Sequence, residues 1–244
     1  MESKVALITG GARGIGRALA LDLASLGWSV AICYRTSAQL AEEVVEGIRR
    51  SGAQGSALQC DVSDPDAAVA WVRRTEHEWG QIDALINCAG PYRRISLLQE
   101  TNENWHAMFD NNLHPVFYLS QAVVPGMKER KWGRIISFSM SNSEQMIAQP
   151  QLTAHYISKV GLVILMRSLA RLVAPFGITA NCVAPGFIDS GSAPKEELES
   201  AAKRIPAGYI GSVDDTTSIV RFLLSDEARY INGANIPVSG AWGV

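Results

Sequence analysis

The sequence predicts a single α/β domain, built on a doubly wound parallel sheet of about seven strands with helices on both faces. Short, uniformly apolar runs alternate with longer amphipathic segments from one end of the chain to the other. Such runs are typical of parallel strands that are buried on both faces by the helices between them. No repeat, low-complexity tract or linker divides the 244 residues, of which 47% are hydrophobic. We therefore treat residues 1–244 as one domain with its ligand site at the carboxyl ends of the strands.

The apolar runs place the seven strands in order along the chain. They are Val5–Thr9, Ser29–Cys33, Gly55–Cys60, Ala84–Asn87, Arg134–Phe138, Thr179–Val183 and Asn235–Val238. The amphipathic segments between them predict six helices, at Gly14–Leu26, Ser37–Arg50, Asp66–Glu78, Glu103–Arg130, His155–Ala174 and Asp214–Leu224.

One long segment, Phe187–Gly211, fits neither pattern. It is rich in Lys, Glu, Ser and Pro and lacks a clear strand or helix partner. Long polar loops of this kind either form lids over a substrate or simply connect two elements through solvent. At this position in the chain, we expect a substrate lid.

Composition excludes several classes of partner. The formal net charge of -2 and the absence of a long basic run argue against nucleic-acid binding. No apolar stretch reaches the roughly 18 residues of a membrane span, and the first residues lack a signal-peptide pattern. The four cysteines stand singly in or beside apolar runs, without metal-ligand spacing. We expect a cytoplasmic protein with reduced core thiols and no metal site.

A glycine-rich turn follows the first predicted strand directly, in the order Thr9-Gly10-Gly11-Ala12-Arg13-Gly14-Ile15-Gly16. Glycine lets the backbone approach a pyrophosphate, and the N–H groups at the start of the next helix favour phosphate oxygens. A strand before the turn and a helix after it are the context of a dinucleotide site. The predicted cofactor contacts here are Gly10, Arg13, Gly14, Ile15 and Gly16.

The spacing of these glycines, three residues and then one, resembles the TGxxxGxG motif of the short-chain dehydrogenase/reductase family. Asn87-Cys88-Ala89-Gly90 resembles the family's NNAG, with Cys as its second residue, and Cys60-Asp61-Val62 resembles its adenine-contacting Asp-Val pair. Ala184–Ser190 and Leu224–Gly233 are similar to its PG segment and to its ending, so the resemblance covers essentially the whole chain. It implies a Rossmann-like fold and further cofactor contacts at Asp61, Val62, Asn87, Ala89, Gly90, Pro185, Gly186 and Ile188.

The end of the second strand indicates which nicotinamide cofactor binds. NAD sites usually place Asp or Glu there, against the ribose hydroxyls. This chain has Arg35 instead, with no acid before Glu42. Arg35 and Arg13 form an arginine pair suited to a 2′-phosphate, although both can also be solvated surface residues. We predict NADP(H).

Two polar residues match the family's catalytic positions. Asn112 precedes Leu113 in a helical segment, and Lys159 lies in a Ser-Lys-Val-Gly sequence at the start of the next long helix. In the resembled family the Lys lowers the pKa of a Tyr that donates a proton, and it also contacts the cofactor. A Ser hydrogen-bonds the substrate oxygen there, and an Asn helps to hold a water relay. The tasks of the Tyr and the Ser are the hardest to assign to residues of this chain, because both positions are displaced.

The family's tyrosine lies four residues before its lysine, about one helical turn away. Here His155 occupies that position, while Tyr156 is only three residues before Lys159. One step along a helix rotates a side chain by about 100°. If one residue is missing at the start of the helix, Tyr156 can still enter the site; otherwise His155 takes the position. We favour Tyr156 and keep His155 as the alternative.

The family's serine is also displaced, because Met140 stands at its position. Ser139 and Ser141 flank Met140, and each can equally be a structural hydroxyl at a strand end. We favour Ser141 and keep Ser139 as the alternative.

The resemblance is closest to 3-oxoacyl-carrier-protein reductases, which implies NADPH-dependent reduction of a small or carrier-linked carbonyl, with 3-oxoacyl thioesters favoured. The altered Tyr and Ser region leaves a pterin, quinone or other small ketone as alternative substrates, and a catalytically silent NADP(H)-binding protein as the alternative function. Arg93 and Arg94 can attract an anionic substrate to the cleft. Lys128, Arg130 and Lys131 resemble a carrier-docking cluster, which Phe176 weakens by replacing an expected arginine.

The two longest predicted helices, Glu103–Arg130 and His155–Ala174, carry many apolar residues. In the resembled family these helices pair between subunits. We therefore expect a homo-oligomer, either a dimer or a tetramer.

Overall fold

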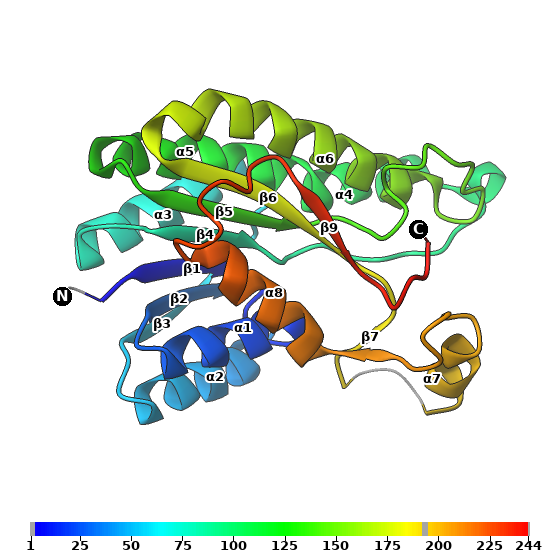
Figure 1. Ribbon diagram of the computed structural model, residues 1–244, viewed down its shortest axis with the longest axis horizontal. Helices are drawn as coiled ribbons and strands as arrows, with labels where there is room; N and C mark the ends of the chain where they lie inside the picture. The colour runs from blue at the N-terminus through cyan, green and yellow to red at the C-terminus, as the bar shows by residue number, and fades with distance from the viewer. Residues whose placement is uncertain (1–2, 192–194, 244) are drawn as a thin grey trace.

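The computed structural model describes residues 3–191 and 195–243. These residues form three layers, with a central parallel sheet covered by helices on both faces (Figure 1). The strand order is β3-β2-β1-β4-β5-β6-β9, which confirms the predicted doubly wound fold. The strands are β1 Val5–Thr9, β2 Ser29–Tyr34, β3 Gly55–Gln59, β4 Ala84–Asn87, β5 Gly133–Phe138, β6 Ile178–Pro185 and β9 Asn235–Val238.

Helices α3 to α6 lie on one face of the sheet, and α1, α2 and α8 lie on the other (Figure 1). Their bounds are α1 Gly14–Ser25, α2 Ala38–Arg50, α3 Pro65–Trp79, α4 Asn102–Asn112, α5 His114–Arg130, α6 Thr153–Val173 and α8 Val213–Leu224. Alternate β1 side chains enter the two cores: Val5 and Leu7 join one, whereas Ala6 and Ile8 join the other. Burial on both faces explains why the strand sequences are uniformly apolar.

The order of the strands determines where a ligand can bind. From β1 the chain continues to β2 and β3 on one side, and then crosses back to β4, β5 and β6 on the other. The connections after β1 and β4 therefore leave the sheet in opposite directions. A crevice opens between them at the carboxyl ends of the strands.

The helix predicted over Glu103–Arg130 is two helices, so that prediction was wrong. α4 ends at Asn112 and α5 begins at His114, with Leu113 between them at φ -117° and ψ -55°. Pro115 explains the break, because its ring clashes with the carbonyl group four residues earlier in a continuous helix and it has no N–H to donate. The break leaves Asn112 at a helix end that faces the crevice region.

The segment Phe187–Gly211 is more regular than the sequence predicts. β7 (Ile188–Asp189) pairs in parallel with β8 (Gly211–Ser212), and α7 spans Lys195–Ala202. The two ends of the segment are thus held together, although they are more than twenty residues apart. Residues 192–194 of the expected lid lie outside the described residues. No helix within 3–191 or 195–243 is long and apolar enough to cross a membrane.

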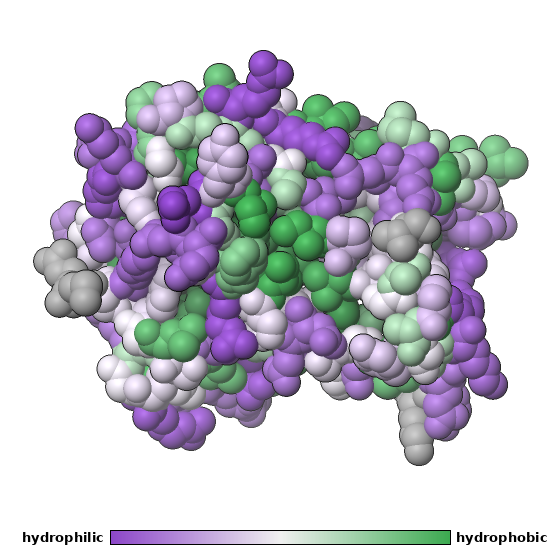
Figure 2. Space-filling view, in the orientation of Figure 1, coloured by the Kyte–Doolittle hydropathy of each residue, from purple (hydrophilic) through white to green (hydrophobic). Residues whose placement is uncertain are grey.

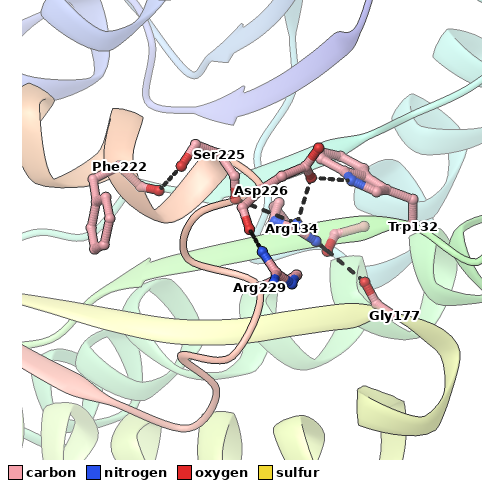
Figure 3. Close-up of polar contacts among 8 residues, drawn as sticks. Trp132, Arg134, Gly177, Phe222, Ser225, Asp226 and Arg229 are labelled. Carbon is pink, nitrogen blue, oxygen red and sulfur yellow. Dashed lines mark hydrogen bonds and ion pairs between the residues drawn. The ribbon is translucent and has the colours of Figure 1, made fainter.

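A buried arginine joins several connections at the amino ends of the strands (Figure 3). Arg134, only 1% exposed, lies at the start of β5. Its guanidinium donates to the backbone oxygens of Gly133 at 2.9 Å and Gly177 at 3.2 Å, and to Asp226 at 3.2 Å. It also lies 4.3 Å from the ring centre of Trp132, whose indole N–H donates to Asp226 at 3.0 Å. One side chain therefore links β5, the turn before β6 and the end of α8.

Candidate active site

A cleft of about 1320 Å³ opens at the carboxyl ends of the strands. Almost every predicted cofactor contact lines it: Gly10, Arg13, Gly14, Ile15, Gly16, Arg35, Asp61, Val62, Ala89, Gly90, Lys159, Pro185, Gly186 and Ile188. Asn87 does not, because it is buried within the sheet and its Nδ2 donates to Ser137 Oγ at 3.0 Å. The structure therefore brings together residues from six separate parts of the sequence.

The glycine turn forms a cradle at one end of this cleft. Gly10 and Gly14 have φ values of +65° and +55°, in the left-handed region that favours glycine. A Cβ on Gly16 would lie 2.5 Å from the backbone oxygen of Gly10. No side chain caps the first N–H groups of α1. These N–H groups and the bare backbone fit a pyrophosphate, so the residues present suit a dinucleotide.

Arg35 lies where the cofactor's ribose is expected. Its side chain is 62% exposed and lies 3.9 Å from Asp61 Oδ2 and 3.4 Å from Asn111 Oδ1. Thr36 and Ser37 also line the cleft, although they are not among the cofactor contacts predicted from the sequence. Their position directly after Arg35 could have indicated them. A guanidinium and two hydroxyls together are suited to hold a phosphate.

Lys159 and Asn112 converge on Gly90 from two different helices. A Cβ on Gly90 would lie 2.4 Å from Asn112 Oδ1 and 3.5 Å from Lys159 Nζ. Lys159 is buried and its ammonium donates to the Phe138 carbonyl oxygen at 2.7 Å. Asn112 Nδ2 donates to the Met108 carbonyl oxygen at 2.9 Å, whereas its Oδ1 has no partner. The Lys159 ammonium and the unpaired Asn112 Oδ1 thus both lie beside Gly90, where each can contact a group that carries a proton.

His155, rather than Tyr156, faces the cleft beside Lys159. α6 is continuous from Thr153, so the residue four positions before Lys159 shares its face and the next residue is turned away. The Tyr156 hydroxyl donates to the Asn142 carbonyl oxygen at 2.9 Å and accepts from Ile147 N at 3.3 Å. The expectation that Tyr156 enters the cleft does not hold. In a regular helix, a residue three positions before Lys159 cannot take the direction of one four positions before it.

Neither serine presents a free hydroxyl. Ser141 is fully buried outside the cleft, and its Oγ donates to the Trp242 carbonyl oxygen at 2.5 Å. Ser139 lines the cleft, but its Oγ donates to Asn235 Oδ1 at 2.6 Å. Met140 lies between them and also lines the cleft. The expected placement of Ser141 is therefore wrong, and a thioether occupies the position at which the resemblance implies a hydroxyl.

Burial controls the charge states of the catalytic cluster. Desolvation and, to a smaller extent, the Lys159 charge lower the pKa of His155 to about 4, against the opposing effect of a hydrogen bond to the backbone of Pro91. Desolvation also lowers the pKa of Lys159 to about 8, against smaller coulombic contributions from Cys88 and Cys182. At pH 7 the imidazole is therefore neutral, while most Lys159 side chains carry a charge.

This buried imidazole should make stability depend on pH. The folded-state pKa of His155, about 4, lies below the ordinary value of 6.5, so the unfolded chain binds more protons between these values. Stability is then fully present above about 6.5 and is lost as the pH falls toward 4, by up to about 3 kcal/mol for this residue. Urea unfolding of the protein and of His155→Leu across this window measures the effect. The prediction would be contradicted if the free energy of unfolding changed with pH equally in the two proteins.

Aromatic side chains surround the other end of the cleft. The Tyr92 and His155 ring centroids lie 5.2 Å apart, with an interplanar angle of 84°, and those of Phe187 and Trp242 lie 4.7 Å apart. Both pairs line the cleft, together with Leu152, Arg94 and Arg204. No local motif marks Trp242. It reaches the cleft because β9 pairs with β6, which brings the residues after β9 to the same sheet edge.

Comparisons with known proteins agree with this geometry. Residues 10–242 match the family model described as enoyl-(acyl carrier protein) reductase. The chain is 37% identical to the 3-oxoacyl-[acyl-carrier-protein] reductase FabG of Pseudomonas aeruginosa, over 98% of this chain and 97% of the relative. It is 38% identical to FabG of Staphylococcus aureus, with the same coverage of both chains.

Two solved structures have the same fold. A putative short-chain alcohol dehydrogenase from Sinorhizobium meliloti superposes with a TM-score of 0.91 at 30% identity, covering 99% of this chain and 97% of the other. The acetoin dehydrogenase YohF from Salmonella typhimurium gives a TM-score of 0.90 at 26% identity, covering 98% and 96%.

Proposed function

The chain belongs to the short-chain dehydrogenase/reductase family, and from that premise we propose that it is an NADP(H)-dependent reductase of carbonyl groups, with 3-oxoacyl thioesters as the favoured substrates. The main observation behind the proposal is one continuous cleft, which runs from the glycine cradle to Lys159 and His155. The names of the curated relatives, which are 3-oxoacyl-carrier-protein reductases, support the substrate class.

Each residue near Gly90 has a task in this reaction. The reduced nicotinamide, when bound, supplies a hydride to the carbonyl carbon. Negative charge then develops on the carbonyl oxygen, and fixed donors must stabilise it. The neutral His155 ring offers an N–H to this oxygen, which is the task that the resemblance implied for a serine. The Lys159 ammonium adds positive charge behind the ring, and the unpaired Asn112 Oδ1 can accept from a water that also contacts Lys159.

A panel of carbonyl compounds tests this function. Loss of NADPH absorbance with 3-oxoacyl thioesters, small ketones, pterins and quinones measures turnover, while a direct titration measures NADPH binding. We expect both turnover and binding. Binding without turnover on any compound would favour the catalytically silent alternative, to which the displaced Tyr and Ser also point.

NADPH should bind more tightly than NADH because of Arg35 and Arg13, which both line the cleft. Charge-assisted hydrogen bonds to the 2′-phosphate should contribute about 1.5–3 kcal/mol, or roughly 10- to 150-fold in Kd. Arg35→Asp should remove or reverse this preference in fluorescence titrations with both cofactors. Arg74→Asp, the same charge change on a residue that does not line the cleft, is the control. Equal affinities in the unmodified protein would contradict the proposal.

One observation favours a small ketone as the second candidate substrate. Of the expected carrier-docking cluster, Lys128 lies 4.5 Å above the Phe176 ring, and Arg130 points inward, donating to the Ile82 carbonyl oxygen at 2.5 Å. Fewer side-chain cations of this cluster are therefore free to bind an acidic carrier protein. A comparison of carrier-linked and free 3-oxoacyl thioesters tests this: equal kcat/KM would show that carrier docking contributes nothing.

We also propose that the chain is a cytoplasmic homo-oligomer and that residues 187–211 act as a lid. Phe117 on α5 is 50% exposed, and Ile164 and Leu172 on α6 are 61% and 70% exposed. Apolar side chains also gather near the middle of the face shown in Figure 2, around β9 and α8. Exposed apolar patches are typical of subunit interfaces. The mass in solution, measured by light scattering, tests this assembly.

A further inference from the structure

We propose that Tyr92, from the loop after β4, donates the proton to the substrate oxygen, a task that the family resemblance gives to a tyrosine on α6. This inference depends on the carbonyl reduction proposed above. No tyrosine of α6 lines the cleft, and the inference assigns the phenol hydroxyl to the loop after β4 instead.

Tyr92 lies at the substrate end of the cleft, and it is held there through its neighbours. Its ring meets His155 edge to face, and both residues line the cleft. The carbonyl oxygen of Pro91, one residue before it, accepts from Asn112 Nδ2 at 3.2 Å. Gly90 packs directly against Asn112 and Lys159. The backbone that carries Tyr92 is thus fixed to the same cluster that holds the substrate oxygen.

The other candidate donors are already engaged. The hydroxyls of Tyr156, Ser139 and Ser141 donate to protein oxygens. His155 is neutral near pH 7, so it can offer a hydrogen bond but not the proton of an imidazolium. Met140, at the position of the family's serine, has no proton to give. Tyr34 also lines the cleft, but it ends β2 beside Arg35, at the opposite end from His155.

The proton transfer completes the reduction. The carbonyl carbon gains a hydride with its electron pair, the C=O π bond breaks, and the oxygen receives the proton of the Tyr92 hydroxyl. The products are an alcohol, the oxidised cofactor and a Tyr92 phenolate. Because Tyr92 is 61% exposed, water can return the proton to it directly. One proton from solvent is consumed in each turnover, as carbonyl reduction requires.

Tyr92→Phe tests this role, because it removes the hydroxyl and keeps the ring that contacts His155. We expect kcat to fall about 100-fold, the usual size of lost acid catalysis, while the Kd for NADPH stays within twofold. Tyr156→Phe and Tyr230→Phe, neither of which lines the cleft, are matched controls that should keep most of the turnover.

The outcomes separate this inference from the proposed function. An unmodified protein that binds NADPH but reduces no carbonyl would overturn the function, and the role of Tyr92 with it. An active protein whose Tyr92→Phe variant keeps kcat within threefold would overturn the role of Tyr92 alone and leave Lys159 or a water as the donor. A Tyr92→Phe variant that loses NADPH binding and turnover together would also overturn it, since the hydroxyl would then support the site rather than the chemistry.

Discussion

Replacing Lys159 with alanine should lower turnover about 1000-fold, within the range expected for lost acid–base and charge assistance. The ammonium is buried beside Gly90, and its charge acts on the neighbouring His155 ring. Initial rates of NADPH oxidation measure the effect, and an NADPH titration shows whether binding is retained. Arg73→Ala, which removes an exposed cation on α3 that does not line the cleft, is the control. Full activity in Lys159→Ala would mean that this protein uses a different mechanism.

The same residue should set the upper pH limit of the reaction. Burial lowers the pKa of Lys159 to about 8, so its positive charge is present below that value and is lost as the pH rises through it. Turnover should therefore decline above about pH 8, and this decline should be absent from the residual activity of Lys159→Ala.

The second large effect concerns stability. Arg134→Ala should lower the free energy of unfolding by about 3 kcal/mol, because it removes a buried side chain and leaves two backbone oxygens without their donor. Figure 3 shows these contacts. Asp226→Asn should cost less than about 1 kcal/mol, since that carboxylate is 71% exposed and its interaction is screened by water. Urea unfolding measures both variants; equal losses would show that the ion pair, and not the buried donor, carries the stability.

Most of the fold was predictable from the sequence because burial on both faces leaves a simple pattern. Val5–Thr9, Ala84–Asn87 and Asn235–Val238 have the predicted bounds. The predicted elements are wrong where a single residue, or a pairing between strands distant in the sequence, overrides the local pattern of apolar residues. Pro115 divides one predicted helix into two, and the short β7–β8 pairing joins residues that share no local signal.

The cofactor end of the site follows motifs that are contiguous in the sequence, and all of its predicted residues except Asn87 line the cleft. The chemical end does not follow from motifs alone. Helical periodicity counted back from Lys159 indicates His155, whereas similarity of sequence context indicates Tyr156, and the geometry of α6 agrees with the periodicity. Hydroxyl partners such as Asn235 for Ser139 and the Trp242 carbonyl for Ser141 are about a hundred residues away. No local reasoning can find them.

The strand order also bears on how the chain acquires its structure. β1 pairs with β2 on one side, but its other partner, β4, lies more than seventy residues further along. Until Ala84–Asn87 has been synthesised and docked, an apolar strand keeps one edge unpaired, and unpaired edges of this kind promote association between chains. Parallel sheets form slowly, because the entropy of closing such long loops is lost before the stabilising contacts between the strands have formed. Fragments that end before β4 should therefore aggregate, and refolding yield should depend strongly on protein concentration.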